Sequence, residues 1–401
     1  MNFYKSNIRM LSQYFRSGEK SEGGRYTGVE IEHFLTHKDG SAVGYEELCG
    51  ILKKIEKNED KEIIDSGKYF GYYNNDYSIT LEPAAQLEIS IAPRESSAET
   101  FKIYDSFITR FNAESDFCVY TEGIHPHARA EELELIPKDR YKYMDKYFKD
   151  TGKHGINMMR SSASAQISVD YFNESDFVKK FRLANILSPI IALITDNSPV
   201  YEGRKNYNYI IRSQIWNDVD NVRCGVIPTL MDKDFGYEKY AQYLMTNPII
   251  LYERDGKTVY SKEKTPSQIY DDRVMSIEEA EHIMSMFFFD VRLKTYIEIR
   301  IADCMEREYT AAYNELIRDI FYDDSYIDRL MKSFGNLSVK DIKNAKKEIM
   351  KRGYEAEVYG MSAAEAAELM LNGAGNECAL LKELAENRTT LRELKLKGNV
   401  I

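Results

Sequence analysis

The chain has 401 residues, of which 43% are hydrophobic and 30% charged, a balance typical of globular proteins and unlike that of disordered or fibrous chains. Its formal net charge is -11, and no long run of lysine or arginine interrupts that acidity. We therefore expect neither nucleic acid nor an anionic membrane surface as a partner.

The first part of the chain predicts a helix followed by two strands with polar faces. Residues 1–15 alternate polar and apolar positions, as a first helix does and a signal peptide does not. In the segment 28–32 a period of two places Glu30 and Glu32 on one face of a strand. The segment 86–91 repeats this pattern with Glu88 on its polar face.

A helix is predicted to follow, because Ser96 and Glu99 form a capping box before apolar residues at helical spacing, ending near residue 112. The segment 165–170 is a third alternating strand, with Gln166 on its polar face. The next helix is expected to begin after Ser175 and carries an apolar stretch that is too short to cross a bilayer.

The last strand of this kind covers residues 296–301, where Glu298 and Arg300 share a face; it follows a helix capped by Ser276 and Glu279. Beyond it, caps at Ser338 and Ser362 and stop signals at two glycines predict short helices. We therefore expect a catalytic domain over residues 1–327 and a helical C-terminal extension over 328–401 that packs on it.

The polar faces of these four strands have two interpretations. They are either the water-facing sides of an ordinary antiparallel sheet or the lining of a cavity. The predominance of glutamate over lysine and threonine favours the cavity. Crowded carboxylates raise one another's pKa unless a cation neutralises them, and oxygen ligands without a cysteine and histidine set point to Mg²⁺, which often shares its coordination sphere with phosphates. A nucleotide is the resulting hypothesis, although no Gly-x-x-x-x-Gly-Lys-Ser/Thr loop is present.

The five cysteines are scattered, odd in number and without a Cys-x-x-Cys pair. This pattern favours a reducing environment, and we expect a cytoplasmic protein.

Several short motifs, taken in order, give the chain a resemblance to plant-type glutamate-cysteine ligases, a family also found in many bacteria. They are Gly28-x-Glu-x-Glu32, Leu81-Glu-Pro83 with Gln86-Leu-Glu88, Met158-Met159, Asn197-Ser-Pro199 with Glu202-Gly203, Arg212-Ser213 with Trp216, Asp220 with Arg223, Val291-Arg-Leu-Lys294, and Tyr296-Ile-Glu-Ile-Arg300. The resemblance implies an α+β, glutamine synthetase-like fold with flanking helices, in which the concave face of a curved, mainly antiparallel sheet holds ATP, metal ions and glutamate.

The resemblance also implies roles for individual residues. Metal ligands would be Glu30, Glu82, Glu88 and Gln166 for two ions, and Glu32 and Glu298 for a third. Arg300 and Glu298 would be catalytic, while Arg212, Arg223 and Trp216 would bind glutamate or ATP. The implied activity is the ATP- and Mg²⁺-dependent formation of γ-glutamylcysteine from glutamate and cysteine through a γ-glutamyl phosphate, the first step of glutathione biosynthesis.

Two departures from the family pattern bear on these roles. Ala84 and Ala85 replace a pair of glycines, and alanine disfavours a positive backbone φ at that loop. The segment after Asp303 also differs, so the amine acceptor could differ. Two other functions therefore stay open: a related carboxylate-amine ligase with another acceptor, and a non-catalytic nucleotide-binding scaffold. A homodimer is also left open.

Overall fold

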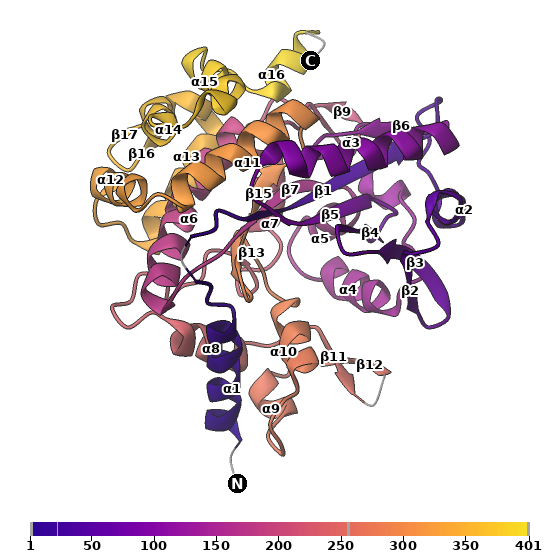
Figure 1. Cartoon of the computed structure of the whole chain (residues 1–401), viewed down its shortest axis with the longest axis horizontal. Helices are drawn as coiled ribbons and strands as arrows, with labels where there is room; N and C mark the ends of the chain where they lie inside the picture. Colours follow the sequence, from indigo (N-terminus) through magenta and orange to yellow (C-terminus); the bar gives the residue numbers. More distant parts are fainter. Residues whose placement is uncertain (1–2, 22, 255–256, 399–401) are drawn as a thin grey trace.

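The computed structural model describes residues 3–21, 23–254 and 257–398, and it combines one large sheet with helices on both of its sides (Figure 1). The sheet has nine strands in the order β14-β15-β7-β1-β5-β4-β3-β2, with β6 paired to the end of β1, and every neighbouring pair is antiparallel. The predicted α+β class with a mainly antiparallel, open sheet is confirmed. The strands are β1 (Thr27–Thr36), β2 (Lys61–Asp65), β3 (Lys68–Tyr73), β4 (Tyr77–Leu81), β5 (Leu87–Arg94), β6 (Cys118–Tyr120), β7 (Ser164–Val169), β14 (Val291–Leu293) and β15 (Ile297–Asp303).

The four strands predicted from alternation are the four consecutive central strands β15, β7, β1 and β5. Their register places the polar positions beside one another: Glu30 pairs with Gln166 on one side and Ser90 on the other, and Glu32 pairs with Glu88. Segments that are up to 270 residues apart therefore share one polar face, because a period of two keeps the face once the register is set.

The apolar alternate positions of these strands are buried under helices. Helix α3 packs on β5, α6 on β15 and β14, and α11 on β7 and β1, while α4 and α5 lie on the opposite side of the sheet from α3 (Figure 1). The helices are α1 (Tyr4–Ser17), α2 (Tyr45–Ile55), α3 (Ser97–Glu114), α4 (Asp139–Lys149), α5 (Gly155–Arg160), α6 (Glu174–Ile194), α7 (Ile211–Asn217), α8 (Tyr237–Thr246), α9 (Pro266–Ile269), α10 (Ile277–Met284), α11 (Arg307–Phe321), α12 (Asp324–Phe334), α13 (Val339–Arg352), α14 (Ala363–Leu371), α15 (Ala379–Glu386) and α16 (Leu391–Leu396).

Helix starts follow the predicted caps. The hydroxyls of Ser96, Ser276, Ser338 and Ser362 each accept a hydrogen bond from the backbone N–H three residues on, so these four caps are confirmed. The start of α6 is corrected: the helix begins at Glu174 and not after Ser175, because the side chain of Asn173 accepts the capping hydrogen bond from the N–H of Asp176. The predicted first helix is α1; residues 1 and 2 of that prediction lie outside the described residues.

Short pairs of strands and single turns of 3₁₀ helix complete the described chain. The strands are β8 (Val200–Tyr201), β9 (Arg204–Lys205), β10 (Cys224–Gly225), β11 (Leu251–Arg254), β12 (Lys257–Tyr260), β13 (Phe288–Phe289), β16 (Glu357–Val358) and β17 (Met361–Ser362), and the turns are η1 (Ala130–Glu132), η2 (Gly353–Glu355) and η3 (Asn376–Cys378). Among the helices described here, none is long and apolar enough to span a membrane.

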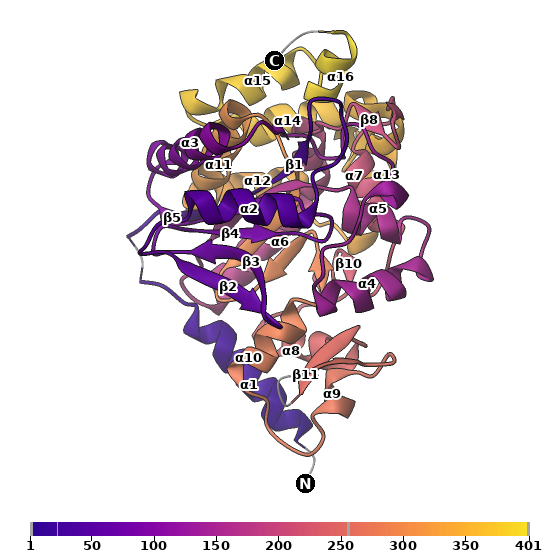
Figure 2. The ribbon, with the colours of Figure 1, turned by 90° about the vertical axis from the view of Figure 1, so that its right-hand side faces the viewer.

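The C-terminal helices gather around α6. Helices α12, α13, α14 and α15 all contact α6, whose other side lies against the sheet. This position explains why the second half of α6, residues 183–194, is buried on all its sides and mostly apolar. Figure 2 shows α14, α15 and α16 at the end of the molecule opposite α1 and α9. The division of the chain at residue 328 stays a prediction.

Candidate active site

The polar face of the central strands forms one wall of a cavity of about 370 Å³. Helices α4, α5 and α7 and the strand β14 supply its other walls. Eight of the ten residues predicted for the site line this cavity: Glu30, Glu32, Glu82, Glu88, Gln166, Arg212, Trp216 and Arg300. The structure therefore supports the cavity interpretation of the strand pattern over that of a water-facing sheet.

Three carboxylates, Glu30, Glu82 and Glu88, form what we call the carboxylate wall. Glu88 accepts hydrogen bonds from the hydroxyls of Thr80 (2.9 Å) and Ser90 (3.0 Å), and Glu82 accepts one from Tyr141 at 3.3 Å. Within the described part of the chain, none of the three carboxylates forms an ion pair. Neutral hydroxyls are thus the recorded hydrogen-bond partners of this wall.

Burial and mutual repulsion raise the pKa of these carboxyl groups. Burial, followed by the charges of Glu82 and Glu32, raises the pKa of Glu88 to about 8. Burial, followed by Glu88 and Glu298, raises the pKa of Glu30 to about 7. The pKa of Glu82 is raised as well, by burial and then by Glu32. Without a cation from outside the protein, this wall holds protons near neutral pH.

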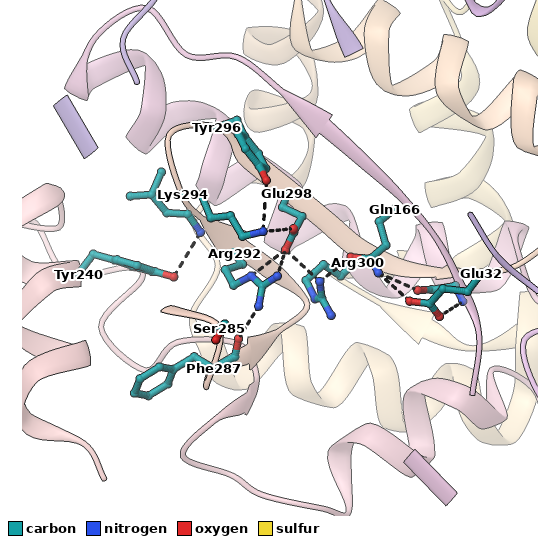
Figure 3. Close-up of polar contacts among 12 residues, drawn as sticks. Glu32, Gln166, Tyr240, Ser285, Phe287, Arg292, Lys294, Tyr296, Glu298 and Arg300 are labelled. Atoms are coloured by element: carbon teal, nitrogen blue, oxygen red, sulfur yellow. Dashed lines mark hydrogen bonds and ion pairs between the residues drawn. The ribbon is translucent and has the colours of Figure 1, made fainter. Parts of the chain in front are cut away.

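The same lining also carries cations: Arg292, Lys294 and Arg300 from the β14–β15 hairpin and Arg212 from α7. We call these four residues the arginine wall, and Figure 3 shows Arg292, Lys294 and Arg300. Three of these cations converge on Glu298, which is fully buried: Arg292 Nε donates to it at 2.7 Å, Lys294 Nζ at 3.0 Å and Arg300 Nη1 at 3.0 Å. Burial would raise the pKa of Glu298, but the three cations outweigh burial and hold the pKa well below its ordinary range.

This arrangement changes the interpretation of Glu298. The resemblance implied a metal ligand and catalytic residue, whereas in the structure protein cations already neutralise this carboxylate. The β14–β15 hairpin produces the contact, because its register places Arg292 directly across from Glu298.

Glu32 and Gln166 connect the two walls. Gln166 Nε2 donates to Glu32 Oε1 at 3.0 Å, and the backbone N–H of Ser164 donates to Glu32 Oε2 at 2.7 Å (Figure 3). The amide oxygen of Gln166 accepts a hydrogen bond from Arg300 Nη1. The resemblance implied Gln166 as a metal ligand, but its amide oxygen accepts a hydrogen bond from Arg300 instead. Gln166 therefore helps to orient Arg300.

Helix α7 brings Arg212 and Trp216 to the cavity. Arg212 donates to the backbone carbonyls of Ile301 (3.1 Å) and Arg300 (3.2 Å), where the register of β15 against β7 shifts and leaves its ladder irregular. Arg212 Nε and Trp216 Nε1 are buried and have no hydrogen-bond partner among the described residues. Unpaired buried donors are costly, so these two N–H groups are candidates to bind a substrate.

Arg223 does not belong to the cavity lining, so the structure does not bring it together with the other predicted substrate anchors, Arg212 and Trp216. Its guanidinium donates to Asp220 at 2.8 Å, to the carbonyl of Pro248 and to the hydroxyl of Tyr147. The physical reason is local, since the carboxylate three residues earlier already neutralises it.

Sequence reasoning missed four cations that line the cavity: Lys138, Arg140, Arg292 and Lys294. The first two come from the start of α4, whose residues carried no alternating pattern. Arg292 and Lys294 lie in the motif over residues 291–294. The short connection from this motif to the strand of Glu298 is typical of a hairpin, and a hairpin would have placed both cations beside Glu298.

One residue of the loop beside Glu82 has a positive φ. Ala85 adopts φ +61°, a left-handed conformation in which its N–H donates to the carbonyl of Glu82 at 3.0 Å. Alanine disfavours a positive φ, and Ala85 adopts one nevertheless. The turn keeps the conformation in which glycine is favoured, at a cost in strain.

The carboxylate wall fits Mg²⁺ in its donor chemistry. It offers only oxygen atoms, and its carboxyl groups have raised pKa values that a cation would lower again. Among the described residues its hydrogen-bond partners are hydroxyls, and it forms no ion pair. In residues 3–21, 23–254 and 257–398, no three acidic, histidine or cysteine side chains form a ready cage. Mg²⁺ usually takes one or two carboxylates and completes its shell with water and phosphate oxygens, so an open wall suits it.

A second hollow of about 410 Å³ shares Glu30 with the cavity. Its lining contains the rings of Tyr73, Tyr77 and Tyr296 together with Pro93. The polar face of the sheet thus has a charged hollow and a largely aromatic hollow that meet at one residue.

Comparison with protein families matches residues 26–397 to glutamate-cysteine ligase family 2 (GCS2). The chain is 31% identical over 305 residues to the chloroplastic glutamate-cysteine ligase of Brassica juncea, covering 73% of this chain and 59% of that protein. It is 29% identical over 333 residues to the corresponding protein of Arabidopsis thaliana, covering 80% of this chain and 64% of that protein. The chain thus spans about three fifths of the length of these relatives.

Among solved structures, the chain resembles glutamate-cysteine ligase from Francisella tularensis in complex with AMP. The TM-score is 0.53 at 10% identity, covering 93% of this chain and 83% of that one. This likeness concerns the fold.

Proposed function

The chain belongs to glutamate-cysteine ligase family 2, as the resemblance of its motifs predicted, and from that premise we propose that it is an ATP- and Mg²⁺-dependent ligase joining the side-chain carboxylate of glutamate to the amine of cysteine. The observation that carries the proposal is that the carboxylate wall and the arginine wall line one and the same cavity. The product would be γ-glutamylcysteine, the first intermediate of glutathione biosynthesis.

The reaction has two steps. In the first, an oxygen of glutamate's side-chain carboxylate attacks the terminal phosphorus of ATP, the bond to ADP breaks, and an acyl phosphate forms. In the second, the amine of cysteine attacks the acyl carbon, phosphate leaves, and the nitrogen loses a proton. No protein nucleophile is required, in agreement with a cavity lined by carboxylates and cations rather than by a nucleophile and its base.

Arg300 is the residue that we place at the transferring phosphoryl group. Its Nη1 donates to Glu298 and Gln166, whereas its Nε and Nη2 donate to no other described residue. Burial would lower the pKa of Arg300, but Glu298, Glu30 and Glu32 outweigh burial and raise the pKa, so the charge is permanent. A fixed guanidinium stabilises charge that develops on phosphoryl oxygens without reorganising.

Glu298 acts, in this proposal, as a positioning residue. It contacts three members of the arginine wall and is fully buried, so it orients the cations without touching a substrate. Arg212 and Trp216, each with one unpartnered N–H, would bind the carboxylate of glutamate or a phosphate oxygen.

Glu30, Glu82 and Glu88 would hold Mg²⁺, which when bound neutralises phosphate charge and orients the triphosphate. The aromatic hollow that shares Glu30 would take the nucleoside, because a flat base stacks well on tyrosine rings. A cytoplasmic location and a homodimer stay predictions from the sequence.

ADP formation with a panel of amines tests the proposal. The purified chain is incubated with ATP, Mg²⁺ and glutamate, with and without cysteine, and the product is identified by its mass. We expect cysteine-dependent ADP release and the mass of γ-glutamylcysteine. Release with another amine alone would establish the related carboxylate-amine ligase instead. Binding of ATP without turnover for every amine would establish the scaffold, and both outcomes would reject the proposed acceptor.

A further inference from the structure

The C-terminal helix α16 reaches the segment that leads into α7. Arg392 is 2% exposed and Asp196 is fully buried, and Arg392 Nε donates to Asp196 Oδ2 at 2.8 Å. The backbone N–H of Arg392 donates to the carbonyl of Asp196 at 3.0 Å, and its Nη1 donates to the carbonyl of Asn206 at 3.3 Å. One residue of α16 is thus bonded to both ends of the segment 196–206.

Asp196 holds the first residue before α7 in an unusual conformation. Its second oxygen, Oδ1, accepts a hydrogen bond from the N–H of Ile210 at 3.2 Å. Ile210 has φ +45° and ψ +45°, a left-handed conformation that a β-branched residue rarely adopts. Such a conformation persists only where the surroundings impose it, and here the partner is the carboxylate that Arg392 holds.

A second contact joins α16 to the same segment. The guanidinium of Arg392 lies over the ring of Tyr209, with its carbon 4.5 Å from the ring centroid, and Tyr209 donates its hydroxyl proton to Glu393 at 2.9 Å. Gly353 also limits the position of Tyr209, because a Cβ at residue 353 would lie 2.4 Å from the ring of Tyr209. The segment before α7 is therefore enclosed by the C-terminal region.

The direction of α7 matters for the cavity, because α7 carries Arg212 and Trp216 to the cavity wall. Arg212 in turn bonds the carbonyls of Arg300 and Ile301 at the irregular point of β15. A continuous series of contacts thus runs from Arg392 through Asp196 and Ile210 to the backbone that presents Arg300.

From this series we infer that Arg392 is a positioning residue for the ligase reaction, and that α16 sets the orientation of α7 and thereby of Arg212, Trp216 and Arg300. The inference rests on the proposed function for its kinetic consequence only. We call Arg392, Asp196 and Ile210 the C-terminal anchor. The alternative is that Arg392 only stabilises the fold, in which case the folded variants would keep an unchanged cavity.

Trp216 is the only tryptophan of the chain, so its fluorescence reports on α7 without substrate or turnover. Arg392→Lys keeps the charge and loses the fork that bonds Asp196 and Asn206. We expect this variant to fold and to show a roughly twofold higher acrylamide quenching constant for Trp216, together with an about tenfold lower kcat, because small displacements of reacting groups have effects of this size. Arg388→Lys is the matched control, since Arg388 lies four residues earlier in an exposed pair with Glu355, and it should change neither quantity.

The proposal is overturned if Arg392→Lys is folded by circular dichroism and keeps the wild-type quenching constant. If that variant does not fold, Tyr209→Phe decides, because it removes one hydroxyl and should produce a smaller shift of the same sign; unchanged quenching there would also overturn the proposal. A chain that shows the fluorescence change but no ligase activity with any amine would support the C-terminal anchor and reject the proposed function.

Discussion

The glutamates of the carboxylate wall and the glutamate bonded to the arginine wall are in opposite electrostatic states. Glu88 and Glu30 have pKa values raised to about 8 and about 7, whereas the pKa of Glu298, a few ångströms from its three cations, lies well below the ordinary value. Burial acts in the same direction on all three carboxyl groups, so their neighbours make the difference. The carboxylates that form no ion pair with a described residue are those suited to a metal, and the one that pairs with three cations is suited to orienting them.

Among substitutions in the arginine wall, the loss of Arg300 should lower the rate of reaction most. We expect Arg300→Ala to lower kcat about 100- to 1000-fold, as the loss of a single charge-stabilising donor does in other enzymes. The Mg²⁺ concentration for half-maximal rate should stay unchanged, because Arg300 faces no metal in this account. Rates of ADP formation across a Mg²⁺ titration measure both quantities, and Arg300→Lys separates charge from the planar fork.

A substitution in the carboxylate wall should change the Mg²⁺ requirement rather than kcat. In Glu88→Gln the amide oxygen can still accept hydrogen bonds from Thr80 and Ser90, but the charge is lost. We expect the Mg²⁺ requirement to rise by about tenfold or more, with most of kcat recovered at saturating Mg²⁺. A loss of kcat that added Mg²⁺ does not restore would contradict the division between the walls.

The metal-free chain should lose stability as pH rises. The folded-state pKa values of Glu30 and Glu88 lie above the ordinary 4.5, so the folded state binds more protons than the unfolded state between pH 4.5 and about 8. Stability therefore falls as pH increases through this window. Thermal melting in EDTA at pH 6.5 and 8.5 should show a lower midpoint at the higher pH, and added Mg²⁺ should restore it. Glu88→Gln should reduce the difference between the two midpoints; an identical difference would contradict the assignment.

The smallest effect is expected at the turn beside the carboxylate wall. Ala85→Gly removes the Cβ from a residue at φ +61°, where an L side chain costs roughly 1–2 kcal/mol, offset by about 0.4–1 kcal/mol of added freedom in the unfolded chain. The melting midpoint should rise by about 1–2 °C for a chain of this size. Ala84, the neighbouring residue, does not have a positive φ, so Ala84→Gly should lower the melting midpoint.

Sequence patterns predicted the elements whose formation depends on residues near one another in the chain. A period of two identified β1, β5, β7 and β15, and Ser-x-x-Asp/Glu motifs located four helix starts, because each depends on neighbours in the chain. The same patterns could not show that Arg292 and Lys294 neutralise Glu298, since that depends on a hairpin register. They also could not show the positive φ of Ala85, which the surrounding loop imposes.

The functional residues follow the same rule. Arg223 was assigned from motif order together with Asp220, and the motif did not show that the two side chains bond to each other. The contact of Arg392 with Asp196 joins residues 196 positions apart and has no local signature. Sequence patterns therefore located most of the groups that meet in the cavity, and missed four of its cations and the long-range contacts of the C-terminal anchor.

Calorimetry of ATP binding to the purified chain, with Mg²⁺ and with EDTA at pH 8, tests the metal site without depending on which amine is the acceptor. We expect ATP to bind in Mg²⁺, and to bind about tenfold or more weakly in EDTA and to Glu88→Gln. Equal affinity under all three conditions would contradict the claim that the carboxylate wall holds the metal that meets the triphosphate.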